Sequence, residues 1–178
     1  MSRVIGIDPG SSKTGFGIVD KTGHHLRHVD SGIIRLKSSQ TLSDKLLSIH
    51  LELTSIIAIH KPDVLAIEEV FYAKNVRSAM VLSHARAAVL LTAALQKLPV
   101  FEYAALEVKR ATTSYGRASK EQVFEMIKRL LNLQNQHIQS MDQTDALAIA
   151  ICHLNTFALE QKIVTENSPH TYKGTYRT

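Results

Sequence analysis

Four carboxylates stand out because each lies next to a strongly apolar segment, either just after it or just before it. Asp8 follows one short apolar run and Glu68 follows a second, whereas Asp142 and Asp145 stand three residues apart just before a third. A lone buried carboxylate is strongly unfavourable unless it is paired, hydrogen-bonded or bound to a cation. These acids therefore need partners.

A shared metal ion is one partner that would satisfy all four acids. Three or four converging carboxylates cannot remain ionised together without a cation, and ligation by oxygen alone suits Mg²⁺ or Mn²⁺. Two such ions could activate water and stabilise both oxygens of an in-line phosphoryl displacement. Simpler roles stay open, because Asp8 could accept hydrogen bonds from its own turn and Asp142 could cap a helix. Asp145 fits capping less well, since apolar residues that must pack on a sheet follow it directly.

The order of the expected elements determines whether these acids can meet. Apolar periodicity and turn residues predict a β-β-β-α-β-α-β order followed by further helices. The expected strands are residues 4–7, 15–19, 26–36, 63–67 and 99–103, and the expected helices are residues 41–61, 78–97, two short ones around a break at 114–116, and a last one that begins near 140. If the first and fourth strands are parallel neighbours, Asp8 and Glu68 emerge at the same carboxyl edge, where open α/β sheets usually bind ligands. The glycines of the second strand would let another backbone or a ligand approach closely.

Composition narrows the possible partners. The chain has 178 residues, 44% of them hydrophobic, which suits one well-packed domain. A net charge of +5 favours a polyanionic partner, with nucleic acid as the leading candidate. The nine histidines and the single Cys152 show no zinc-ligand spacing. Because no stretch approaches the length of a membrane span and no signal-peptide pattern precedes Asp8, we expect a cytoplasmic protein with no membrane partner.

Four motifs carry a resemblance to a known family over roughly residues 1–158. They read IGIDPGSSKTGFGIV, PDVLAIEEVFYAKNVRSAMVLSHARAAVLL, VKRATTSYGRASKEQV and DQTDALAIAICH. In this order and spacing, the chain resembles RuvC-type crossover (Holliday) junction endodeoxyribonucleases of the ribonuclease H-like superfamily. The resemblance implies that Asp8, Glu68, Asp142 and Asp145 are metal-binding catalytic acids, and it selects Glu68 over Glu69.

Further site residues follow from the same resemblance. It implies that Lys120 acts beside the scissile phosphate. It also implies DNA contacts by Phe71, Tyr72, Asn75, Lys109, Gly116, Arg117 and Lys120. The alternatives are a core aromatic for Phe71 and solvated surface charges for the lysines. The family's glycine-rich loop is incomplete, because Ser114 stands where the first of two glycines often lies, and Ser83 and Ala87 likewise replace glycines common in the second long helix.

The resemblance also implies a fold, a reaction and partners. The fold would be a ribonuclease H-like five-stranded mixed sheet, with strands 1 to 3 antiparallel and strands 4 and 5 parallel, flanked by helices. Residues 1–158 would form the nuclease domain and residues 159–178 a polar, flexible tail. A homodimer with two Mg²⁺ ions per site, replaceable by Mn²⁺, would resolve four-way junctions in recombination and repair by paired symmetric nicks, leaving 5′-phosphate and 3′-hydroxyl ends. A branch-migration motor of the RuvA and RuvB type would be its partner.

Three matters remain open from the sequence. The candidate dimer surface is the Ala-rich helix at residues 78–97, with Met80, Val81, Ala88, Leu91 and Leu95 available, although its own core could use them all. One rival class is the ATPase superfamily of actin and the sugar kinases, whose phosphate-binding hairpin follows a similar strand, but those proteins need two such domains. Another rival is a junction-binding protein without catalysis, against which the presence of all four acids argues.

Overall fold

The computed structural model describes residues 1–69, 76–133 and 140–167 of the chain. The strands are β1 (Ser2–Asp8), β2 (Lys13–Thr22), β3 (His25–Arg35), β4 (Val64–Glu68) and β5 (Val100–Tyr103). The helices are α1 (Leu42–His60), α2 (Val76–Leu95), α3 (Ala105–Thr113), α4 (Lys120–Leu130) and α5 (Met141–Asn167). The predicted order of strands and helices is therefore confirmed.

The five strands form one mixed sheet in the order β3-β2-β1-β4-β5. Strand β2 pairs antiparallel with both β1 and β3. Strand β4 runs parallel to β1, and β5 runs parallel to β4. This is the predicted arrangement of an antiparallel meander extended by two parallel strands, and it places β1 at the centre of the sheet.

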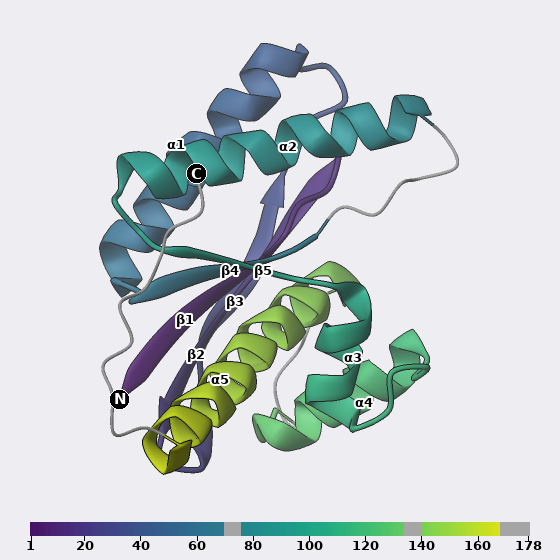
Figure 1. The fold of residues 1–178 in the computed structure, drawn as a ribbon. Helices are drawn as coiled ribbons and strands as arrows, with labels where there is room; N and C mark the ends of the chain where they lie inside the picture. Colours follow the sequence, from purple (N-terminus) through teal and green to yellow (C-terminus); the bar gives the residue numbers. More distant parts are fainter. Residues whose placement is uncertain (70–75, 134–139, 168–178) are drawn as a thin grey trace.

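Helices cover both faces of the sheet (Figure 1). Helices α1 and α2 lie on one face, whereas α5 runs along the other, with α3 and α4 beside it. Successive strand residues point to opposite faces. Ile5 and Ile7 of β1 accordingly pack in the core under α1 and α2, whereas Val4 packs in the core that includes Leu147 and Ile151 of α5.

Local sequence sets the ends of the helices. Thr41 caps α1, because its side chain accepts from the Asp44 amide while Asp44 accepts from the Thr41 amide, and Lys61 ends the helix in a left-handed conformation. The predicted helix at residues 41–61 is confirmed. Helix α5 continues to Asn167, so it extends into the segment predicted as a polar tail; residues 168–178 lie outside the described part of the chain. Within the described residues, no helix is both long and apolar enough to cross a bilayer.

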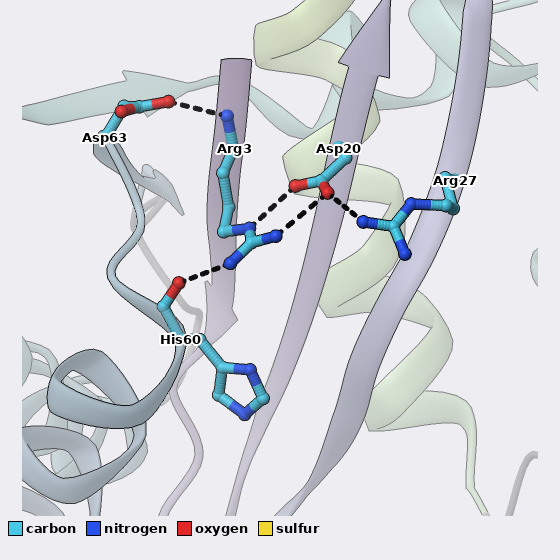
Figure 2. Close-up of polar contacts among 5 residues, drawn as sticks. All are labelled: Arg3, Asp20, Arg27, His60 and Asp63. Carbon is cyan, nitrogen blue, oxygen red and sulfur yellow. Dashed lines mark hydrogen bonds and ion pairs between the residues drawn. The ribbon is translucent and has the colours of Figure 1, made fainter. Parts of the chain in front are cut away.

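An ion-pair network fixes the end of the sheet opposite Asp8 (Figure 2). The buried carboxylate of Asp20 on β2 lies 2.7 Å from Arg3 Nε and 2.5 Å from Arg27 Nη2, which come from β1 and β3. Arg3 also donates to the His60 carbonyl at 2.7 Å, and its backbone amide donates to Asp63 at 2.7 Å. The network links three strands to the end of α1 and holds their register.

Candidate active site

Asp8 and Glu68 end two neighbouring parallel strands at the same edge of the sheet. Ile7 of β1 pairs with Ile67 of β4, so the acid that follows each of them emerges beside the other. Strand alternation directs both carboxylates to the face that α5 covers, because Ile7 and Ile67 occupy the opposite face. The prediction that the two acids share one carboxyl edge is confirmed.

The first turn of α5 brings Asp142 and Asp145 to this edge. The helix lies very close to the sheet, since a Cβ atom on Gly15 would be only 2.1 Å from the Asp142 carbonyl oxygen. Gly15 is the cross-strand partner of Asp8. The glycines of β2 therefore allow the close backbone approach that the sequence predicted, and they admit the helix that carries the second pair of acids.

The charges of the four acids interact. Burial, followed by the nearby charges of Asp145, Glu68 and Asp142 in that order of importance, raises the pKa of Asp8 to about 7 against the opposing effect of Lys120. Burial and then Asp145 also raise the pKa of Glu68. Ionised Asp8 and Glu68 are thus unfavourable in the metal-free protein, as expected where carboxylates converge without a cation.

Lys120, the first residue of α4, contacts one of the four acids directly. Its ammonium Nζ lies 3.2 Å from Asp145 Oδ2, and the charges of Asp145, Asp8 and Asp142 raise its pKa. A cavity of about 260 Å³ opens here, bounded by Glu68, Asp145, Lys109, Lys120 and four apolar residues of α3, α4 and α5. The cavity thus carries two carboxylates and two ammonium groups, and it can receive an anionic group beside the acids.

The donor set fits a hard divalent cation, although the ligand shell is not closed. Carboxylate oxygens are the ligands that Mg²⁺ and Mn²⁺ prefer, and burial and the charges of three neighbouring acids disfavour the ionised form of Asp8, which a bound cation would stabilise. Among the residues that the structure describes, no three acidic, histidine or cysteine side chains already form a metal-ligand cluster. Side-chain rotations would have to complete the shell, with Asp145 exchanging its contact with Lys120.

Arg86 of α2 is a supporting residue that sequence reasoning missed. Its Nη1 donates to the Glu68 carbonyl at 2.9 Å, and its Nη2 pairs with Glu102 on β5. The arginine thereby fixes the backbone at the end of β4, where Glu68 departs from the sheet. An arginine in the middle of a helix rich in alanine and leucine was the available signal, but the sequence could not identify its partners.

The predicted DNA contacts fall into two groups. Phe71, Tyr72 and Asn75 lie outside the described residues. Lys109 borders the cavity, whereas Gly116 and Arg117 belong to the connection between α3 and α4, where Arg117 is exposed.

The incomplete glycine loop has a structural consequence at Ser114. This residue ends α3 with a φ of 60°, a left-handed conformation that glycine adopts at little cost and serine does not. Serine therefore occupies a position where a glycine would be relaxed.

The order and directions of the five strands, with helices on both faces of the sheet, are those of the ribonuclease H-like fold. The family model for crossover junction endodeoxyribonuclease RuvC matches residues 4–153. The chain belongs to the RuvC family.

Similar proteins agree with this assignment. The chain is 46% identical over 157 residues to crossover junction endodeoxyribonuclease RuvC of Syntrophotalea carbinolica, a match that covers 88% of this chain and 96% of that protein. It is 48% identical over 153 residues to the Citrifermentans bemidjiense protein of the same name, covering 86% and 92% of the two chains. The structure of T. thermophilus RuvC in complex with a Holliday junction substrate superposes with a TM-score of 0.84 at 28% identity, covering 90% of this chain and 97% of that one. The yeast mitochondrial resolvase Ydc2 shares the fold, with a TM-score of 0.70 at 13% identity over 93% of this chain and 82% of that one.

Proposed function

We propose that this protein is a structure-selective endonuclease that resolves four-way DNA junctions in recombination and repair. The observation that carries the proposal is the convergence of Asp8, Glu68, Asp142 and Asp145 beside two lysines, in a chain with a net charge of +5. Membership of the RuvC family supports the same reaction class and metal dependence. The finer features, namely two Mg²⁺ ions that Mn²⁺ can replace, paired symmetric nicks, and 5′-phosphate and 3′-hydroxyl products, are part of the proposal.

The residues of the site would have three roles in this reaction: metal binding, phosphate binding and support of the Glu68 backbone. Asp8, Glu68, Asp142 and Asp145 would hold the metal ions, which, when bound, supply activated water and stabilise the departing oxygen. Lys120 places its ammonium group 3.2 Å from Asp145, where it can bind the phosphate that approaches the acids and offset its charge. Arg86 keeps the Glu68 backbone in place through the carbonyl contact.

The DNA would lie across the carboxyl edge of the parallel strands. Lys109, Gly116, Arg117 and Lys120 would contact its backbone, because the lysines border the cavity and Arg117 is exposed on the adjoining connection. Phe71 would stack on a base at the crossover, with Tyr72 and Asn75 beside it. We also assign the nuclease domain to residues 1–158 and a polar tail to residues 159–178, with a branch-migration motor of the RuvA and RuvB type as partner in the cytoplasm.

A second copy of this chain would complete the reaction. One site of this kind cuts one strand, and a two-fold dimer offers two identical sites for two strands of like polarity. On α2, the apolar Met80, Val81, Leu91 and Leu95 are exposed, whereas Ala88 is buried and contributes to the subunit's own core. Exposed Leu47 and Leu51 of the adjacent α1 extend this apolar surface, and a groove of about 340 Å³ lies between the two helices. This surface is the proposed dimer contact.

The direct test is incubation of the purified protein with a mobile four-way junction and with a linear duplex of the same sequence. With Mg²⁺, denaturing gels should show paired nicks in the junction and an intact duplex; with EDTA, native gels should show junction binding without cleavage. Binding of ATP without any effect on the junction would instead favour the ATPase superfamily of actin and the sugar kinases.

A further inference from the structure

The start of α5, which carries Asp142 and Asp145, is fixed to the sheet by Gln143, one of the two residues between these acids. The two acids are three positions apart and share one side of the helix, whereas Gln143 points to a different side. Its Nε2 donates to the Ser31 hydroxyl at 2.7 Å and to the Ser31 carbonyl at 3.2 Å. Gln143 is only 7% exposed. The amide therefore makes two partly buried hydrogen bonds to a strand that carries none of the four acids.

The Gln143 contact holds α5 from the side of the sheet away from Glu68. Ser31 lies on β3, at the opposite side of the sheet from β4, which carries Glu68. The acids of α5 face β1 and β4 while Gln143 fastens the same helical turn to β3. Rotation of the turn about the helix axis would move the acids relative to Asp8, and it would also break the Gln143 bonds. The bonds thus oppose that rotation.

A second contact limits the distance between the turn and the sheet. A Cβ atom on Gly15 would lie 2.1 Å from the Asp142 carbonyl oxygen and 2.7 Å from its carbonyl carbon. Because Gly15 pairs directly with Asp8, the bare Cα at this position sets the spacing between Asp8 and the backbone of Asp142. Gly17 also touches α5, but at Leu147, beyond both acids: a Cβ atom there would lie 2.7 Å from the Leu147 side chain and 2.8 Å from its amide nitrogen.

We propose that Gln143 and Gly15 are positioning residues of the acidic site: Gln143 fixes the rotation of the first turn of α5, and Gly15 fixes its height above β1 and β2. The inference rests on the proposed metal-dependent function. Neighbours that orient metal ligands change metal affinity by about 10-fold to 100-fold when they are replaced. A residue that only fills the core would change stability without a specific change in metal affinity.

The experiment measures Mn²⁺ binding to the full-length, DNA-free protein by isothermal titration calorimetry, together with Tm in EDTA. Gln143→Leu keeps the volume of the side chain but removes both hydrogen bonds, and it should weaken Mn²⁺ binding by about 10-fold or more. Ser31→Ala should weaken binding less. The double variant should bind no more weakly than Gln143→Leu alone, because both changes remove the same contact.

Glycine variants provide a matched comparison. Gly15→Ala should weaken Mn²⁺ binding by about 10-fold or more, whereas Gly17→Ala should lower Tm comparably and leave affinity within about threefold of wild type. Equal weakening by the two glycine variants, or unchanged affinity in Gln143→Leu, would overturn the inference. If Gln143→Leu does not fold, Ser31→Ala carries the test, and unchanged affinity there has the same meaning. Wild-type protein that binds no Mn²⁺ would overturn both the proposed function and this inference. Wild-type protein that binds Mn²⁺, together with variants of unchanged affinity, would overturn this inference alone.

Discussion

The ammonium group of Lys120 lies 3.2 Å from the Asp145 carboxylate, where the N-terminal parts of α4 and α5 meet. The residues are 25 positions apart in the sequence, and each begins or nearly begins its helix. In the metal-free protein this lysine supplies positive charge to an edge where four carboxylates converge. The contact joins the basic segment of the chain to its acidic site.

Replacement of Lys120 should therefore affect catalysis more than binding. We expect Lys120→Ala to reduce single-turnover cleavage by about 10²-fold, because a preorganised cation beside the reacting phosphate is lost. Lys128→Ala is the matched control, since Lys128 lies on the same helix and pairs with Glu125 away from the acids. Equal effects of the two substitutions on the cleavage rate would make Lys120 an ordinary surface charge.

Asp8 should destabilise the metal-free protein at alkaline pH. Burial and the neighbouring acids raise its pKa from 3.8 to about 7. The folded state therefore binds more protons than the unfolded state between these values, and stability is lost as pH rises through this window. In EDTA at pH 8, Asp8→Asn should raise Tm by about 5 °C, and the gain should shrink toward pH 5.

Calorimetry across this pH range tests the expectation. Saturating Mg²⁺ should raise the Tm of the wild type and remove the advantage of Asp8→Asn, because the ion binds only the folded wild-type site. A Tm of Asp8→Asn in EDTA that stays below that of the wild type at pH 8 would show that Asp8 is stabilised by other contacts.

The Asp20 network should contribute to stability but not to catalysis. Asp20→Asn leaves two arginines without their buried anion, so we expect a loss of about 3 kcal/mol in the free energy of unfolding. Hydrogen bonding to Arg3 lowers the pKa of Asp20, so this contribution is present at neutral pH and is lost as pH falls below 3.8 through the folded-state pKa.

Urea unfolding and cleavage assays separate these two effects. Asp63→Asn is the mild control, because Asp63 accepts only the exposed Arg3 amide within this network. Cleavage per folded Asp20→Asn molecule should equal that of wild type, since the network lies at the opposite end of β1 from Asp8. A specific loss of cleavage would mean that the register of β1 and β2 controls the site.

Ser114→Gly should stabilise the protein by about 1 kcal/mol. The residue has a φ of 60° at the end of α3, and glycine relieves the steric conflict of a side chain in this conformation. Ser114→Ala retains the Cβ atom and should give no such gain. Urea midpoints of the three proteins provide the comparison, and equal midpoints for Gly and Ala would contradict the strain.

The sequence was sufficient for the parts of the site that depend on local pattern. Apolar runs that end in acids predicted β1 and β4 with Asp8 and Glu68 side by side, and the spacing of Asp142 and Asp145 predicted one helical face. The glycines of β2 predicted that another backbone approaches this strand closely, and the backbone of α5 does so.

Contacts between distant segments could not be predicted in the same way. The Gln143 bonds to Ser31 span 112 positions, and the Arg86 contact with Glu68 depends on how α2 lies over the sheet. Periodicity shows which face of an element is buried but does not identify the polar partner on a neighbouring element. The conformation of Ser114 likewise arises from how α3 ends and could not be read from residue type.

A comparison of junction binding with junction cleavage in Asp145→Asn and Glu68→Gln tests whether the converging acids form a metal-dependent nuclease centre. Each variant should bind a four-way junction in EDTA as tightly as wild type, since neither loses positive charge. With Mg²⁺, each should leave every strand of the junction intact on a denaturing gel while wild type produces paired nicks. Cleavage of the junction by either folded variant at the wild-type rate would show that the acid replaced is not required for catalysis.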